Sequence, residues 1–121
     1  MLKKFNFFIP IILLFFWSSN SFAESFDSKL REIRAEINRD NLNKAINLLK
    51  KIEIENELQQ DKINVLFGDI YLKINQPIKA EEFYQKSFFT SNEEIEALTY
   101  IGFAEVKLVQ GKLKDAIEYA E

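Results

Sequence analysis

One pattern of residues occurs twice in this chain, and it limits the possible folds more than any other feature. In each copy a bulky apolar residue precedes a small residue, and a second small residue follows 12 positions later. The copies lie 36 residues apart and contain, in order, Phe67, Gly68 and Ala80, and then Phe103, Ala104 and Ala116. Self-similarity at this period is typical of stacked pairs of helices. We therefore expect an all-α repeat domain that presents a surface to a partner.

The first 23 residues have the layout of a secretory signal peptide. Two lysines open the segment, an uncharged apolar run covers residues 7–17, and residues 21–23 place small side chains before a cleavage point. The apolar run is shorter than the roughly 20 residues that cross a bilayer. We expect residues 1–23 to be removed after Ala23 and the protein to be periplasmic or secreted. The alternative is an uncleaved helix that anchors the chain in a membrane.

The charge of the exported part limits its partners. All 19 acidic residues lie after Ala23, whereas Lys3 and Lys4 leave with the signal, so 14 of the 16 basic residues remain and the net charge is −5. This balance disfavours general affinity for nucleic acid or anionic lipid. The chain has no cysteine, so neither a disulfide nor a lipid-modified cysteine is available. Packing alone must then stabilise the domain.

Apolar residues recur at helical spacing along the whole mature chain, and no segment alternates like a strand. Asn41 is expected to cap the second helix, Pro77 suits the first turn of the fourth, and Ser91 with Glu94 resembles a capping box near the start of the fifth. The six expected helices form three pairs, at residues 27–38 with 42–54, 57–74 with one beginning at 77, and about 92–110 with 113–121. Residues 24–56 form a degenerate first pair and residues 57–121 the two clearer repeats, of which the last is truncated.

These residues resemble the pattern of the tetratricopeptide repeat family, in which a Leu-Gly pair precedes a Tyr and an Ala-x-x-x-Phe follows. The resemblance implies a right-handed superhelix of about three antiparallel helix pairs. It also implies a protein-interaction scaffold of the cell envelope or of secretion machinery, with no cofactor. The matching residues, which would pack the repeats together, are Phe67, Gly68, Tyr71, Ala80 and Tyr84, and then Tyr100, Phe103, Ala104, Gly111 and Ala116. Gly68 is expected to face Ala80, and Ala104 to face Ala116.

In the resembling family, the first helix of each pair lines a concave groove that binds a peptide or a helix. Carried over to this chain, the groove residues are Arg34, Ile37, Val65, Asp69, Leu72, Lys73, Leu98, Ile101, Glu105 and Leu108. An apolar strip flanked by single charges suits an extended or helical protein segment. The alternative is that the apolar members of this strip are covered by other helices.

Residue types that commonly carry catalysis are missing. Without His or Cys, the chain has neither the commonest general base nor the usual ligands of transition metals. Glu81-Glu82 and Glu93-Glu94 are adjacent pairs, and neighbours on a helix point apart. The aromatic residues fall at core spacing, so packing is the expected role of Phe67, Phe83, Tyr84, Phe88, Tyr100 and Phe103. We expect no enzymatic activity, no metal site and no cofactor.

The last expected helix stops after about nine residues and lacks the polar capping helix with which repeat arrays end. Either the array continues in a longer protein, or Tyr100, Ile117 and Tyr119 meet another chain. We therefore expect self-association, or marginal stability, of the isolated chain.

Overall fold

The chain is all-helical over the residues that the structure, a computed structural model, describes, which are 25–111, 118 and 120. The helices in chain order are α2 (Phe26–Asn38), α3 (Leu42–Lys51), α4 (Glu57–Lys73), α5 (Pro77–Lys86) and α6 (Glu93–Val109). None of these helices is long and apolar enough to cross a membrane. The expected signal peptide, Ala116 and most of the expected sixth helix lie outside the described residues.

Side-chain caps fix where three of the helices begin. Ser25, Asn56 and Asn92 each accept a hydrogen bond from the backbone N–H three residues on, at 3.1, 2.9 and 3.0 Å. Such caps satisfy one of the free N–H groups at a helix start. The expected start near Asn92 is confirmed, with Asn92 as the capping side chain instead of Ser91. Pro77 opens α5, where no N–H is required.

The ends of α2, α4 and α6 share one geometry. The residue after each C-cap has a positive φ, 61° at Asp40, 65° at Asn75 and 75° at Gly111. Asn75 donates its N–H to the Leu72 carbonyl and Gly111 to the Leu108 carbonyl, both at 3.0 Å. This left-handed ending satisfies carbonyls that the helix leaves free. The N-caps Asn56 and Asn92 and the endings Asn75 and Gly111 are 36 residues apart, so the repeat in sequence is also a repeat of helix boundaries.

The second helix is shorter than expected. It ends at Lys51 instead of Ile54, and Ile52 already has an extended backbone with ψ of 134°. Glu53 follows at once, and a carboxylate is unfavourable next to the negative end of a helix. Lys50 and Lys51 instead occupy the last turn, where cations are favoured.

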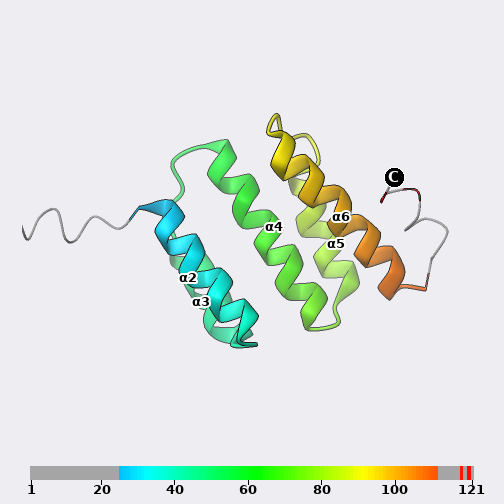
Figure 1. Cartoon of the computed structure of the whole chain (residues 1–121), viewed down its shortest axis with the longest axis horizontal. Helices are drawn as coiled ribbons and strands as arrows, with labels where there is room; N and C mark the ends of the chain where they lie inside the picture. Colours follow the sequence, from blue (N-terminus) through cyan, green and yellow to red (C-terminus); the bar gives the residue numbers. More distant parts are fainter. Residues whose placement is uncertain (1–24, 112–117, 119, 121) are drawn as a thin grey trace, which may run out of the picture.

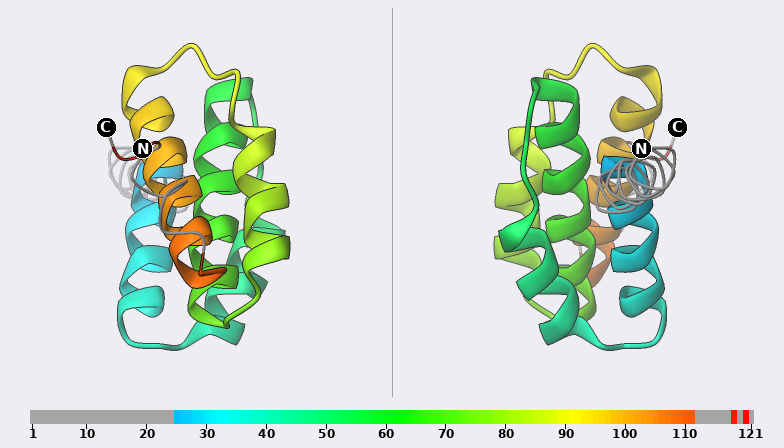
Figure 2. Two further views of the ribbon diagram at one scale, coloured as in Figure 1. Left: turned by 90° about the vertical axis from the view of Figure 1, so that its right-hand side faces the viewer. Right: turned by 90° about the vertical axis from the view of Figure 1, so that its left-hand side faces the viewer.

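The helices form two layers (Figure 1). α2, α4 and α6 lie side by side in one layer, and α3 and α5 lie behind them. Contacts join α4 to every other helix, whereas α2 does not contact α6. Seen along the row of front helices, α4 is set back from α2 and α6 (Figure 2). The front layer is therefore bent.

Two apolar clusters stabilise this arrangement, and α4 contributes to both. The first joins α2, α3 and α4 through buried residues such as Leu30, Ile33, Leu49, Ile63 and Ile70. The second joins α4, α5 and α6 through Val65, Ala80, Tyr84, Ile95, Phe103 and Val106. Because α4 packs on both sides, it is apolar over much of its circumference.

Candidate binding groove

An open pocket of about 710 Å³ lies on the bent layer. Among the described residues, only α2, α4 and α6 line it, and α2 and α4 are the first helices of the pairs α2–α3 and α4–α5. Its residues are Arg34, Ile37, Asn38, Leu66, Asp69, Leu72, Lys73, Leu98, Ile101, Gly102, Glu105, Leu108 and Val109. We call this surface the groove.

All the residues expected to line a groove do line this one, except Val65. Val65 and Leu66 are both 4% exposed, but Val65 packs with Tyr84 and Val106 in the second cluster, on the side of α4 away from the groove. Its neighbour Leu66 takes the position instead, because Leu66, Asp69 and Lys73 follow one face of α4 at helical spacing. The same spacing in the sequence could have indicated Leu66. The groove also contains three other residues that were not expected there, which are Asn38, Gly102 and Val109.

The α6 wall of the groove is apolar and exposed. Ile101 and Leu108 are each 51% exposed, and Val109 is 49% exposed. Leu108 and Val109 are adjacent and Ile101 lies about two turns earlier, on a helix whose other side is buried in the second cluster. Exposed apolar residues that are contiguous mark a surface that a partner can cover.

Tyr84 lies at the centre of the packing behind the groove. It projects from α5, is completely buried, and its ring edge lies against both Gly68 of α4 and Gly102 of α6. A methyl group at either glycine would come within 2.5 Å of this ring. The two glycines therefore make room for Tyr84 between the helices.

This contact differs from the expected one. The atoms nearest to a methyl group at Gly68 belong to Tyr84 and not to Ala80, although Ala80 is fully buried as expected of a packing residue. The contact of Ala104 with Ala116 lies outside the described residues, and Ala104 itself is buried. Gly102 is the glycine that had no assigned role in the repeat. Its distance of 34 residues from Gly68, the usual period of the resembling family, is the sequence signal that points to it.

The Tyr84 hydroxyl donates a hydrogen bond of 2.5 Å to Oδ1 of Asp69, a residue that lines the groove. Asp69 is half-buried in the middle of α4. Its burial raises the pKa of its carboxyl to about 6, and the repulsion from Glu105 acts in the same direction, against the hydrogen bond from Tyr84. Burial beside Asp69 also raises the pKa of Tyr84, which therefore stays protonated and donates.

Charges of both signs surround Asp69. Arg34 on α2 and Lys73 on α4 lower the pKa of Asp69, whereas Glu105 on α6 raises it. Lys73 also contacts Asp40, with 3.6 Å between Nζ and Oδ1. Asp69 and Glu105 are the two carboxylates that the groove brings together. Both were expected in the groove. The adjacent acidic pairs considered for catalysis do not line it, and one of their residues, Glu81, pairs with Lys107 of α6 at 3.6 Å.

The remaining aromatic repeat-packing residues form contacts away from the groove, whereas the packing role expected of Gly111 was wrong, because Gly111 is exposed and has no atom of the described residues near the place of a methyl group. Phe83 stacks on Phe67 and on Tyr71, with ring centroids 4.8 and 5.4 Å apart. Phe88 packs edge-on against Tyr100 and Phe103, both at 5.8 Å. Phe88 is nevertheless 38% exposed, so its assignment to the core was wrong. It belongs to the connection between α5 and α6, which no further element covers among the described residues.

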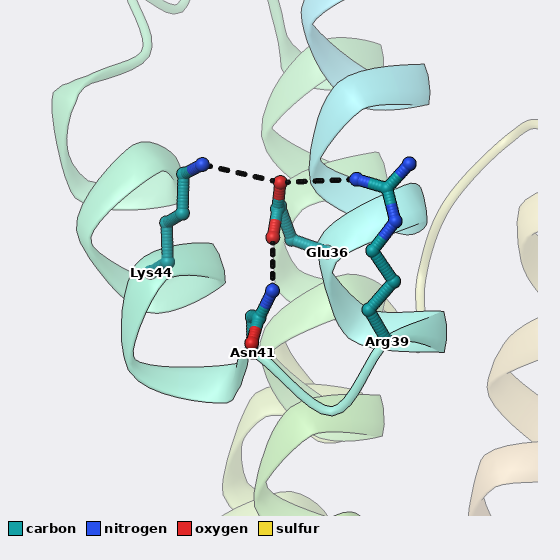
Figure 3. A network of polar contacts seen from close by, with 4 residues as sticks. All are labelled: Glu36, Arg39, Asn41 and Lys44. Carbon is teal, nitrogen blue, oxygen red and sulfur yellow. Dashed lines mark hydrogen bonds and ion pairs between the residues drawn. The ribbon is translucent and has the colours of Figure 1, made fainter.

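A second acidic residue, Glu36, has a different environment in the first pair (Figure 3). Its carboxylate accepts a hydrogen bond of 2.8 Å from Asn41 and lies 3.2 Å from the Lys44 ammonium and 3.4 Å from Arg39. The hydrogen bond from Asn41, followed by that from Lys44, lowers the pKa of Glu36. Asn41 is thus at the expected N-cap position of α3, but its side chain donates to Glu36 and does not cap the helix.

No known protein indicates an activity for this site. No family model, no curated protein and no solved structure matches the chain. Within residues 25–111, 118 and 120, no group of three or more acidic side chains is placed to hold a metal ion. The groove is therefore interpreted from its own geometry.

Proposed function

We propose that the chain is an exported scaffold of the tetratricopeptide type, which binds a peptide or a helix of a partner protein in the groove. Its helix pairs would form a right-handed superhelix of about three repeats, with α6 opening the last. By analogy with exported proteins of that family, it would act in assembly of the bacterial cell envelope or in secretion. It would act by binding and not by catalysis.

One observation carries this proposal. The groove is lined by α2 and α4, the first helices of two successive pairs, and by α6, and it leaves Ile101, Leu108 and Val109 about half exposed. A partner segment that covers these side chains would remove apolar surface from water, which stabilises a complex by about 25 cal/mol per Å². A volume of about 710 Å³ falls within the range of ligand pockets.

A photoactivatable amino acid in place of Ile101 tests the proposal in living cells. The control carries the same amino acid in place of Ile78, an exposed apolar residue of α5 that does not line the groove. We expect a specific protein adduct from position 101 and none, or only diffuse background, from position 78. Equal adducts from both positions, or none from position 101, would contradict binding in the groove.

The location of the protein is a separate part of the proposal. Export with cleavage after Ala23 would release a periplasmic or secreted protein. The second possibility is the soluble arm of a membrane complex with an uncleaved N-terminal helix. Sequencing the N-terminus of protein purified from the cell envelope distinguishes them, since Glu24 as first residue supports cleavage and a retained Met1 supports the anchor.

A further inference from the structure

The groove has two carboxylates, those of Asp69 and Glu105, within an apolar surface, and we call this pair the acidic point. Asp69 on α4 and Glu105 on α6 both line the groove, and Glu105 is the ionised group that perturbs Asp69 most. Neither carboxylate has an ion-pair partner within 4 Å in the described part of the chain. Asp69 accepts the Tyr84 hydroxyl on one oxygen and leaves further lone pairs free.

The cations of the groove do not neutralise this point by direct pairing. Lys73 lies at the last turn of α4 and pairs with Asp40 of the turn between α2 and α3. Arg34 projects from α2, on the opposite wall from Glu105. Both act on Asp69 at longer range, and more weakly than Glu105 does. A further cation between Asp69 and Glu105 would relieve their repulsion.

Apolar side chains flank this point on α6. Ile101 lies four residues before Glu105 and Leu108 lies three after it, so they are about 6 Å and about 4.5 Å away along the helix axis at 1.5 Å per residue. A small cation alone would leave both of them exposed. A peptide whose basic residue has apolar neighbours would cover them, at two positions away if it is extended or at three to four if it is helical.

Tyr84 holds the acidic point in a fixed geometry. The ring is buried between Gly68 and Gly102, so the hydroxyl that binds Asp69 has little freedom to move. A carboxylate that is already oriented loses less entropy when it binds a cation.

From this arrangement we propose that the occupant of the groove is a peptide segment with one lysine or arginine between apolar residues, whose cation lies between Asp69 and Glu105. The assignment rests on the proposed function and narrows it to a class of partner. An acidic segment would instead place like charges against both carboxylates, which costs affinity.

The test identifies the ligands that the groove selects from random sequences. A displayed library of random peptides of about twelve residues, long enough for an extended or helical segment, is panned against the full-length chain as purified from the envelope. We expect the enriched peptides to share a Lys or Arg with apolar residues on both sides. Enrichment of peptides without a basic residue would overturn the assignment and leave the proposed function standing, whereas no enrichment would count against both.

Affinity measurements on one enriched peptide then locate the cation. Replacing its basic residue by norleucine is expected to weaken binding about ten-fold, and Glu105→Gln is expected to cause a similar loss. Combining the two changes should weaken binding little further, because both remove the same contact. Glu94→Gln is the matched control, since Glu94 is an exposed glutamate of α6 outside the groove. Independent, additive losses, or an unaffected Glu105→Gln variant, would overturn the assignment.

The pH dependence of the same affinity gives a second readout. Because the pKa of Asp69 is about 6, binding of the basic peptide should weaken between about pH 7.5 and about pH 5. Asp69→Asn should bind more weakly and lose most of this dependence. A wild-type affinity that does not change with pH would contradict a cation at Asp69.

Discussion

Two acidic residues with low exposure show how the first helix pair differs from the groove. Glu36 is 5% exposed and has three partners, of which Asn41 and Lys44 come from the start of α3. Asp69 is half-buried, has the Tyr84 hydroxyl as its hydrogen-bond partner and faces the repulsion of Glu105. The pKa of Glu36 is lowered, whereas that of Asp69 is raised. A carboxylate with all its partners fixes a turn, and one whose partners are incomplete leaves a place for a ligand.

The largest loss of stability is expected from Gly102→Ala, which disturbs the packing behind the groove. Its new methyl group would come within 2.5 Å of the confined Tyr84 ring. Overpacking of this kind costs about 1–3 kcal/mol, although Ala is the better helix former. Urea unfolding followed by circular dichroism should show the loss.

Gly68→Ala should behave like Gly102→Ala, because it meets the same ring edge. Tyr84→Leu combined with Gly102→Ala should cost less than the sum of the two single changes, since the clash is then absent. Strict additivity would show that Tyr84 is not confined between the two glycines. A change in the first pair, such as one at Glu36, should not couple to either.

The next effect concerns Asp69 and the pH dependence of stability. Its pKa rises from 3.8 to about 6 on folding, so the folded state binds the proton more tightly. Stability should therefore increase as the pH falls from about 7 towards about 4, by about 1–2 kcal/mol after allowance for solvent screening. Asp69→Asn should remove this gain in a series of urea titrations. A wild-type stability that is flat over this range would contradict the raised pKa.

Helix type and most boundaries could be predicted from the sequence, because caps and turn residues act locally. Asn92 and Pro77 mark helix starts through their own backbone geometry. We expected Val65 in the groove, but the structure has Leu66 there. Both residues are apolar and adjacent, so only the packing of α4 against helices on two sides determines which of them lines the groove. Gly102 could have been found from its distance of 34 residues to Gly68, but its contact with Tyr84 could not, because Tyr84 is contributed by a different helix. The raised pKa of Asp69 likewise depends on α5 and α6, which no local pattern specifies.

A smaller effect, separate from the groove, is expected from Thr99→Val. Thr99 of α6 and Ser87 beside α5 are both buried, and their hydroxyls lie 2.9 Å apart. The change removes the hydrogen bond from Thr99 to the Ile95 carbonyl and the contact with Ser87, which still donates to the Tyr84 carbonyl, at a cost of about 1 kcal/mol. Unfolding should detect this loss, whereas the affinity for a groove peptide should not change. Weaker binding by the variant would indicate that the α5–α6 contact also shapes the groove.

The smallest effect at neutral pH is expected from Glu36→Gln, which tests the first pair alone. The amide keeps the size of the side chain and can still accept from Asn41, but it loses the charge that Lys44 and Arg39 face. Because folding lowers the pKa of Glu36 from 4.5, its contribution is present above about that pH and is lost as the pH falls further. The variant should therefore lose less stability than the wild type in acid, in the range below the gain due to Asp69. Lys44→Gln, which removes one of the three partners, should show a weaker form of the same change. If the variant loses as much stability in acid as the wild type does, the Glu36 network orients the turn without stabilising it.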